Sequence, residues 1–195
     1  KFVSRAEYER REDLDWLEML GVAHRAFVIP EGGSNASALE GVAALVDEIE
    51  EPFDVLICPV GTGGTLAGIA SGLQGNQSVL GMASLKGESY LEELIEGLLP
   101  EHKQQNWSIN HSYHFGGYAK FDEALISFMM SFSEQTGIPL DPVYTGKMMF
   151  GLFDLIRKDH FEAGSKLIAL HTGGLQGVVG FNKKFGKNLK VIHGV

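Results

Sequence analysis

The sequence predicts an α/β fold in which a parallel sheet is covered by helices on both faces. Segments typical of buried strands alternate along the chain with segments of helical periodicity, a pattern characteristic of three-layer parallel sheets. A glycine-rich turn joins one strand to the following helix, as in proteins that bind a phosphate at the edge of such a sheet. The 195 residues, 44% of them hydrophobic, suffice for one layered domain.

Four apolar runs are the expected strands, and three amphipathic stripes are the expected helices of the core. Apolar residues three or four positions apart lie on one face of a helix, so each stripe is expected to be buried. Ser34 or Asn35 is expected to cap the first of these helices, after a turn at Gly32 and Gly33. The strands are residues 26–29, 54–60, 78–83 and 166–170; the stripes are Leu39, Val42, Ala43, Val46 and Ile49, then Leu125, Phe128, Met129 and Phe132, then Met149, Leu152, Phe153 and Ile156.

The turn Gly61-Thr62-Gly63-Gly64-Thr65 follows the second expected strand and opens a helix-like stretch. Backbone N–H groups at a helix N-terminus lack partners within the helix, and the helix dipole adds positive charge, so a phosphate would bind there. A dinucleotide motif needs glycine where Leu66 stands, and a nucleoside-triphosphate loop needs serine or threonine where Met148 follows Lys147. A phosphate monoester remains, as in pyridoxal phosphate, flavin mononucleotide or a sugar phosphate; the alternative is a turn without a ligand.

The composition favours a small-molecule partner. The formal net charge is −9 and the basic residues are scattered, which argues against nucleic acid and anionic membranes as partners. The single cysteine, Cys58, excludes an internal disulfide and is expected to be buried in its apolar strand. A single cysteine fits a reducing cytosol, and no uncharged apolar stretch reaches about 18 residues. We therefore expect a soluble, cytoplasmic protein.

A metal site could be built from His111 and His114 with Asp122 or Glu123 nearby. In a strand, however, the two histidines would point to opposite faces, and no third ligand has useful spacing. We therefore expect loop or edge histidines and no metal ion.

Four motifs in this order resemble the pyridoxal-phosphate enzymes of the D-cysteine desulfhydrase and 1-aminocyclopropane-1-carboxylate deaminase family. They are residues 30–35 (Pro-Glu-Gly-Gly-Ser-Asn), 61–65, 141–147 (Asp-Pro-Val-Tyr-Thr-Gly-Lys) and 171–174 (His-Thr-Gly-Gly). The similarity runs from Val3 to about Gly177. It implies a fold of the tryptophan-synthase-β type (fold type II), pyridoxal 5'-phosphate as cofactor, a small amino acid as substrate and a homodimer.

The resemblance also implies roles for individual residues. Residues 61–65 match the loop that holds the cofactor phosphate, in agreement with the turn described above. Tyr144 matches a tyrosine beside the cofactor ring that handles substrate protons, and it is the expected catalytic residue. Thr145 stands at the position that faces the pyridine nitrogen, and His171, Thr172 and Gly173 match a segment bordering the cofactor.

One essential feature of this family is not in its usual surroundings. Pyridoxal-phosphate chemistry requires a lysine that forms the resting Schiff base, and no lysine here lies in the family's Asn-Lys-x-Arg context. The nearest match, Asn182-Lys183-Lys184-Phe185, lies at the wrong end of the chain. We expect the lysine in a segment before Lys1, so that residues 1–35 end a small domain and residues 36–195 form most of the large cofactor-binding domain.

The residue after Tyr144 bears on the reaction. A carboxylate beside the pyridine nitrogen would keep it protonated and suit the ring to opening a cyclopropane, whereas Thr145 is neutral. In the resemblance, the deaminase branch carries glutamate here and the desulfhydrase branch threonine. We expect β-elimination of D-cysteine to hydrogen sulfide, pyruvate and ammonia. The alternatives are 1-aminocyclopropane-1-carboxylate deaminase and, in another class, a non-catalytic domain that binds a phosphorylated ligand.

Overall fold

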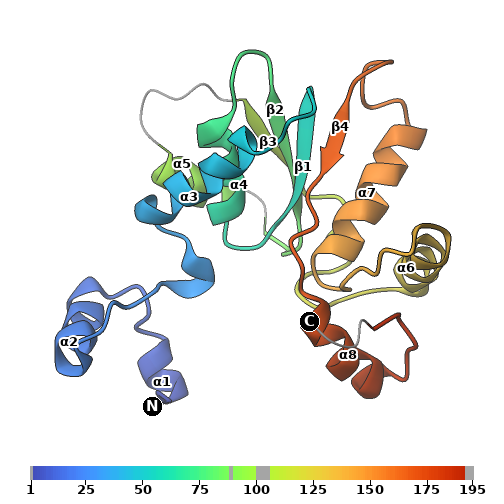
Figure 1. Ribbon diagram of the computed structural model, residues 1–195. Coiled ribbons are helices and arrows are strands. Elements are labelled where there is room, and N and C mark those ends of the chain that lie inside the picture. Colours follow the sequence, from blue (N-terminus) through green and yellow to red (C-terminus); the bar gives the residue numbers. More distant parts are fainter. Residues whose placement is uncertain (1, 88–89, 100–105, 192–195) are drawn as a thin grey trace.

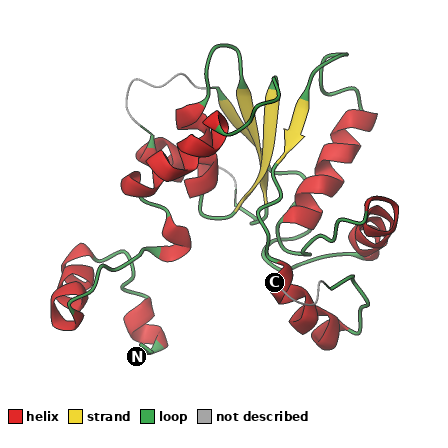
Figure 2. Cartoon of the chain, viewed as in Figure 1, coloured by secondary structure: helices red, strands yellow, loops and turns green. Residues whose placement is uncertain are grey.

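The computed structural model describes residues 2–87, 90–99 and 106–191. In these ranges four parallel strands form one sheet in the order β3-β2-β1-β4. Because the strands are parallel, their carboxyl ends lie at one edge, as Figure 2 shows. Their bounds are β1 Val55–Val60, β2 Ser78–Ala83, β3 Trp107–Asn110 and β4 Leu167–Ala169.

Helices cover both faces of this sheet (Figure 1). On one face, α3 (Ala36–Asp47), α4 (Gly64–Gly72) and α5 (Tyr90–Leu98) pack on Leu56, Cys58 and Val60 of β1. On the other, α7 (Thr145–Arg157) packs on Ile57 and contacts α6 (Glu123–Thr136). This division follows from the alternation of side chains along a strand.

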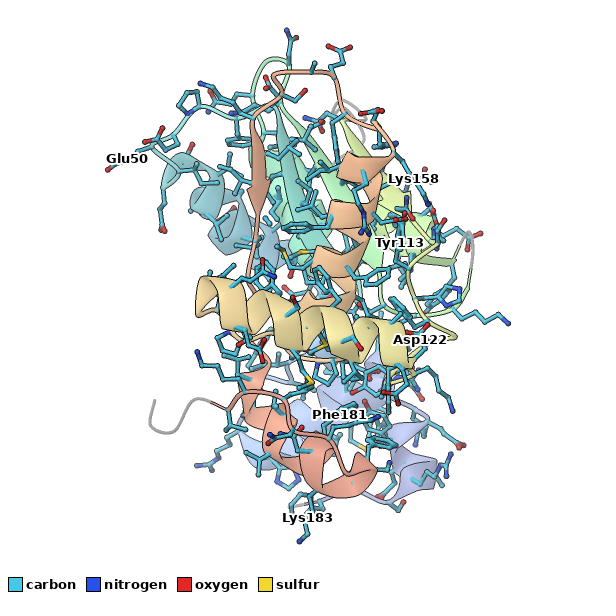
Figure 3. All side chains as sticks on the ribbon, turned by 90° about the vertical axis from the view of Figure 1, so that its right-hand side faces the viewer. Glu50, Tyr113, Asp122, Lys158, Phe181 and Lys183 are labelled. Atoms are coloured by element: carbon cyan, nitrogen blue, oxygen red, sulfur yellow. The ribbon has the colours of Figure 1, made fainter. Side chains whose placement is uncertain are left out.

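The remaining helices lie outside these two layers. Figure 1 shows α1 (Arg5–Tyr8) and α2 (Leu14–His24) apart from the sheet. Figure 3 places Phe181, in α8 (Val178–Phe185), between α8 and α6. There Phe181 and Leu125 of α6 belong to one buried apolar cluster, separate from those on the two faces of the sheet. Two 3₁₀ turns, Glu31–Gly33 and Leu175–Gly177, complete the described elements.

Three of the four expected strands are confirmed, to within a residue or two, as β1, β2 and β4. The strand expected at residues 26–29 is wrong: this segment pairs with no strand of the described chain, and Phe27 and Ile29 are 80% and 72% exposed. A strand needs a hydrogen-bonding neighbour, which residue type alone does not supply. Strand β3 was not expected from the sequence, because it is only four residues long and contains just two apolar residues, Trp107 and Ile109.

The expected helical stripes are confirmed in their centres and less so at their outer edges. Leu39, Val46, Leu125, Met129 and Leu152 are buried, as is Cys58. The exposed positions are Phe153 and Ile156 of α7, although the ring of Phe153 still contacts Phe128 and Phe132 of α6. Of the two expected capping residues, Asn35 is the cap of α3: its Oδ1 accepts the Ala38 N–H at 3.0 Å.

No helix in the described part of the chain combines the length and the apolar character needed to cross a bilayer.

Candidate functional site

A cleft of about 680 Å³ opens where β1 ends. Its wall consists of the end of β1, the turn of residues 61–65, the start of α4, Glu31 and Gly32, two residues near the start of α7, and part of the segment that follows β4. Ligands of open parallel sheets bind at this position, outside the carboxyl ends of the strands. The fold therefore brings together parts of the motifs at residues 61–65, 141–147 and 171–174. Glu31 and Gly32 of the fourth motif, residues 30–35, lie at the same cleft.

The turn of residues 61–65 lines this cleft. Gly63 precedes α4 with a φ of 86°, and no side chain caps the helix, so the first N–H groups of α4 have no capping acceptor. A Cβ on Gly63 would lie 2.8 Å from Ile95 Cγ1, so only glycine fits without displacement. An uncapped helix start with this close approach of the backbone suits a phosphate.

Tyr144 lies over this turn. A Cβ on Gly61 would be 3.2 Å from Tyr144 Cε1 and 3.5 Å from its hydroxyl, so the ring sits directly against the backbone of Gly61. The ring of Tyr118 meets that of Tyr144 edge to face, with centroids 6.3 Å apart. Burial, followed by the nearby Tyr118, Asp141 and Glu31, raises the pKa of Tyr144, so its phenol is protonated at neutral pH.

Asp141 organises the start of α7, a role that was not expected from the sequence. Its Oδ1 accepts the N–H groups of Val143 (2.8 Å) and Tyr144 (2.9 Å). Its Oδ2 accepts both the N–H (2.8 Å) and the hydroxyl (2.7 Å) of Thr145. All four bonds come from the turn that carries Tyr144, so this buried carboxylate fixes the direction in which the tyrosine leaves the backbone. An aspartate shortly before a helix was the available signal.

Two of the predicted site residues lie away from the cleft wall. Thr145 is fully buried and its hydroxyl is bonded to Asp141. His171 uses Nε2 to donate to the carbonyl of Pro139 (2.9 Å) and Nδ1 to accept the N–H of Gly173 (3.1 Å). Both hydrogen bonds of the imidazole are therefore internal. Thr172 and Gly173 do line the cleft.

The two histidines considered as metal ligands have separate partners. His111 Nε2 lies 2.7 Å from Glu92 Oε1, and His114 Nδ1 accepts the Gly116 N–H at 2.8 Å. Within the described ranges, no group of three or more His, Cys, Asp or Glu side chains is arranged to hold a metal ion.

The family model described as "Pyridoxal-phosphate dependent enzyme" matches residues 3–173, which include the phosphate turn and Tyr144. The chain belongs to this family. Two curated relatives of this chain are named for specific reactions. The Arabidopsis thaliana "Bifunctional D-cysteine desulfhydrase/1-aminocyclopropane-1-carboxylate deaminase, mitochondrial" is 34% identical over 79% of this chain, and the Serratia proteamaculans "D-cysteine desulfhydrase" is 30% identical over 77%.

A solved structure supports the same assignment. The protein described as an "ACC deaminase homologue" superposes with a TM-score of 0.74 at 31% identity, over 94% of this chain and 60% of its own. The chain spans about half the length of the curated relatives it matches, 43% and 51% for the two named above. The fold of the chain is thus the fold type II that the resemblance to the family implied.

The cleft fits the family's cofactor at its phosphate end. The uncapped start of α4 can satisfy a phosphate, and the Tyr144 ring stands beside it. Among the described residues that form the cleft wall, none is a lysine.

Proposed function

We propose that the complete protein catalyses β-elimination of D-cysteine to hydrogen sulfide, pyruvate and ammonia. The observation that carries the proposal is that both acidic residues of the cleft already have partners. Glu31 pairs with Arg11 Nε at 2.9 Å, and Asp141 accepts four hydrogen bonds from its own turn. With neutral Thr145 after Tyr144, the chain offers no free carboxylate along the described cleft wall to hold a proton on a pyridine nitrogen.

Residues 61–65 would hold the cofactor phosphate through their backbone N–H groups, and Thr172 and Gly173 also line the cleft. Thr145 and His171 remain predicted cofactor contacts, which would need a rearrangement of their present hydrogen bonds. When bound, pyridoxal phosphate supplies an electron sink for charge that develops on the substrate α-carbon.

Tyr144 is the proposed proton carrier. Because its pKa is raised, Oη carries a proton at neutral pH, and it can donate that proton to a departing thiolate sulfur. As a base it would first have to lose this proton, which burial disfavours. The edge contact with Tyr118 restricts the ring to the side of the cleft that holds Gly61.

The second candidate is deamination of 1-aminocyclopropane-1-carboxylate. It is favoured by the Arabidopsis relative, whose name gives both activities, and by the solved structure described as an ACC deaminase homologue. The two reactions differ in the bond that breaks, a C–S bond or a strained C–C bond, and the second needs the stronger electron sink.

Steady-state kinetics on the complete, cofactor-loaded protein separate these reactions. We expect a higher kcat/KM for sulfide release from D-cysteine than for ammonia release from the cyclopropane amino acid. Tyr144→Phe should lower kcat on D-cysteine by about 100-fold or more, the usual range for loss of a general acid. A cyclopropane substrate with the higher kcat/KM would overturn the proposal.

Tyr113→Phe is the matched control for that experiment. The Tyr113 hydroxyl donates to Asp154 Oδ2 at 2.8 Å, and Figure 3 shows this tyrosine beside α7, on the same side as Lys158. It forms no part of the cleft wall, so its variant should retain activity.

We further propose that residues 1–35 belong to a smaller domain, that residues 36–195 belong to the cofactor-binding domain, and that the protein is a cytoplasmic homodimer. The separation of α1 and α2 from the sheet in Figure 1 supports the domain division. The single, buried Cys58 suits a reducing compartment. The partly exposed Phe153 and Ile156 leave apolar surface on α7 that a second copy could cover.

A further inference from the structure

Lys147 is a buried cation whose hydrogen-bond partners among the described residues are all backbone oxygens. The side chain, on the first turn of α7, is 1% exposed. Its Nζ donates to the carbonyls of Gly117 (2.7 Å), His114 (2.9 Å) and Ser84 (3.3 Å). No carboxylate of the described residues forms an ion pair with it, although buried charges are usually paired. A ring of carbonyl oxygens is how proteins replace the hydration shell of a monovalent cation.

The ammonium form prevails at neutral pH, although burial lowers the pKa of Lys147 to about 8. At neutral pH the three carbonyl oxygens are therefore bound to a positively charged ammonium group.

The segment that supplies two of these carbonyls is strained. Between His114 and Lys120, four residues have a positive φ: Phe115 (55°), Gly116 (95°), Gly117 (120°) and Ala119 (53°). Non-glycine residues adopt this conformation only when their surroundings enforce it. The His114 carbonyl also accepts the Gly117 N–H, and the Gly117 carbonyl accepts the Lys120 N–H, so the ammonium binds the oxygens that close two successive turns.

This segment carries Tyr118, whose ring contacts Tyr144. The third carbonyl belongs to Ser84, whose N–H donates to the carbonyl of Val60, the residue before the phosphate turn. One ammonium therefore connects the start of α7, the segment with Tyr118 and the sheet edge that carries the phosphate turn.

We propose that Lys147 is a positioning residue whose ammonium acts as an internal monovalent cation. It holds the strained segment 114–120 so that Tyr118 supports Tyr144. When the side chain is shortened, a free monovalent cation can take the place of the ammonium. The effect of Lys147 on turnover rests on the proposed function, whereas its effect on the backbone conformation of residues 114–120 does not.

Hydrogen exchange of the complete protein tests the cation directly. Wild type, Lys147→Ala and Lys147→Met are compared at neutral pH and equal ionic strength in chlorides of sodium, potassium, ammonium, n-propylammonium and tetramethylammonium. In tetramethylammonium, which is too large for the site, amides of residues 114–120 in Lys147→Ala should exchange at least about tenfold faster than in wild type. Potassium, ammonium or n-propylammonium should restore most of the protection.

Wild type should not respond to the salt series, and Lys147→Met, which keeps the stem and fills the space, should remain unprotected in every salt. The proposal would be overturned if residues 114–120 of Lys147→Ala exchanged as slowly as in wild type in tetramethylammonium. It would also be overturned if they exchanged equally fast in all five salts. If Lys147→Ala folds in none of them, Lys147→Met decides: fast exchange confined to residues 114–120 supports the proposal, and wild-type protection contradicts it.

A double-mutant cycle tests the link to catalysis. If Lys147 acts through Tyr118, then Lys147→Met and Tyr118→Ala should each lower kcat on D-cysteine, and the double variant should be no slower than Tyr118→Ala. Additive losses would show that Lys147 does not act through Tyr118. Should D-cysteine not be a substrate, the exchange experiment still decides the role of the cation, so the two hypotheses fail separately.

Discussion

Gly63 shows how one missing side chain can decide a binding site. Its positive φ and the 2.8 Å approach of a hypothetical Cβ to Ile95 both exclude larger residues. Left-handed backbone at a non-glycine residue costs about 1–2 kcal/mol, and the contact with Ile95 adds to this. The residue therefore keeps the start of α4 open without strain.

Gly63→Ala should weaken binding of pyridoxal phosphate to the complete protein by at least about tenfold, because the added methyl displaces either the turn or Ile95. Spectrophotometric titration measures the change. Gly75→Ala is the control, since Gly75 has a φ of 58° but nothing within 4 Å of its Cβ position. It should lose stability and keep its affinity. Equal affinities in wild type and folded Gly63→Ala would remove this turn as the phosphate site.

Sequence spacing placed residues in the correct loop but could not fix the direction of each side chain. Residues 61–65 and Tyr144 line one cleft, as expected from their positions after β1 and before α7. Thr145 is next to Tyr144 in sequence, yet its hydroxyl turns inward because the carboxylate of Asp141 accepts it. The aspartate before α7 indicated a cap, but the donation of the Thr145 hydroxyl to it depends on a local turn geometry that residue types alone do not fix.

At the scale of the element, α7 depends on its first turn. The helix begins immediately after Tyr144, which supplies no side-chain cap, so Asp141 satisfies the backbone three to four residues ahead. The same carboxylate is packed against Gly174, whose Cβ would lie 3.1 Å from Oδ2. The start of α7 and the segment after β4 are thus fixed against each other.

Asp141→Asn should lower the free energy of unfolding by about 2–3 kcal/mol, because the amide NH₂ cannot accept the N–H and hydroxyl of Thr145. Urea denaturation measures this loss. Asp122→Asn is the control: Asp122 caps α6 by accepting one N–H, from Leu125 at 2.9 Å, and asparagine caps equally well. A loss at Asp141 no larger than at Asp122 would contradict the role of Asp141.

Strands were predictable where pairing partners were also predictable. Residues 54–60 and 78–83 are continuous apolar runs, and both lie in the centre of the sheet. Residues 26–29 have similar composition but no partner strand in the described chain, while β3, only four residues long, pairs with β2 along its whole length. The edge strand β4 was also predicted, so it is the presence of a partner that decides, and a single segment does not encode that partner.

At the scale of the whole molecule, the cleft brings together a phosphate site and a phenol, and none of the described residues along its wall is a lysine. Lys147, although three residues from Tyr144, is buried with its Nζ bound to three carbonyls. The other described lysines do not line the cleft, and Lys1 and Lys103 lie outside the described residues. A reactive aldehyde seated at the phosphate turn would thus meet no described amine of this chain along that wall.

We therefore expect that the 195-residue chain, incubated with pyridoxal phosphate and reduced with borohydride, carries only scattered, substoichiometric pyridoxyl groups and releases no sulfide from D-cysteine. Peptide mass spectrometry locates and quantifies the adducts. Labelling in excess inorganic phosphate is the control, because phosphate competes with the cofactor for residues 61–65. The scattered pattern of pyridoxyl-lysine adducts should not change, since surface lysines react independently of the cleft. Stoichiometric labelling of one lysine, abolished by phosphate and accompanied by turnover, would instead mean that an amine of this chain reaches the cleft.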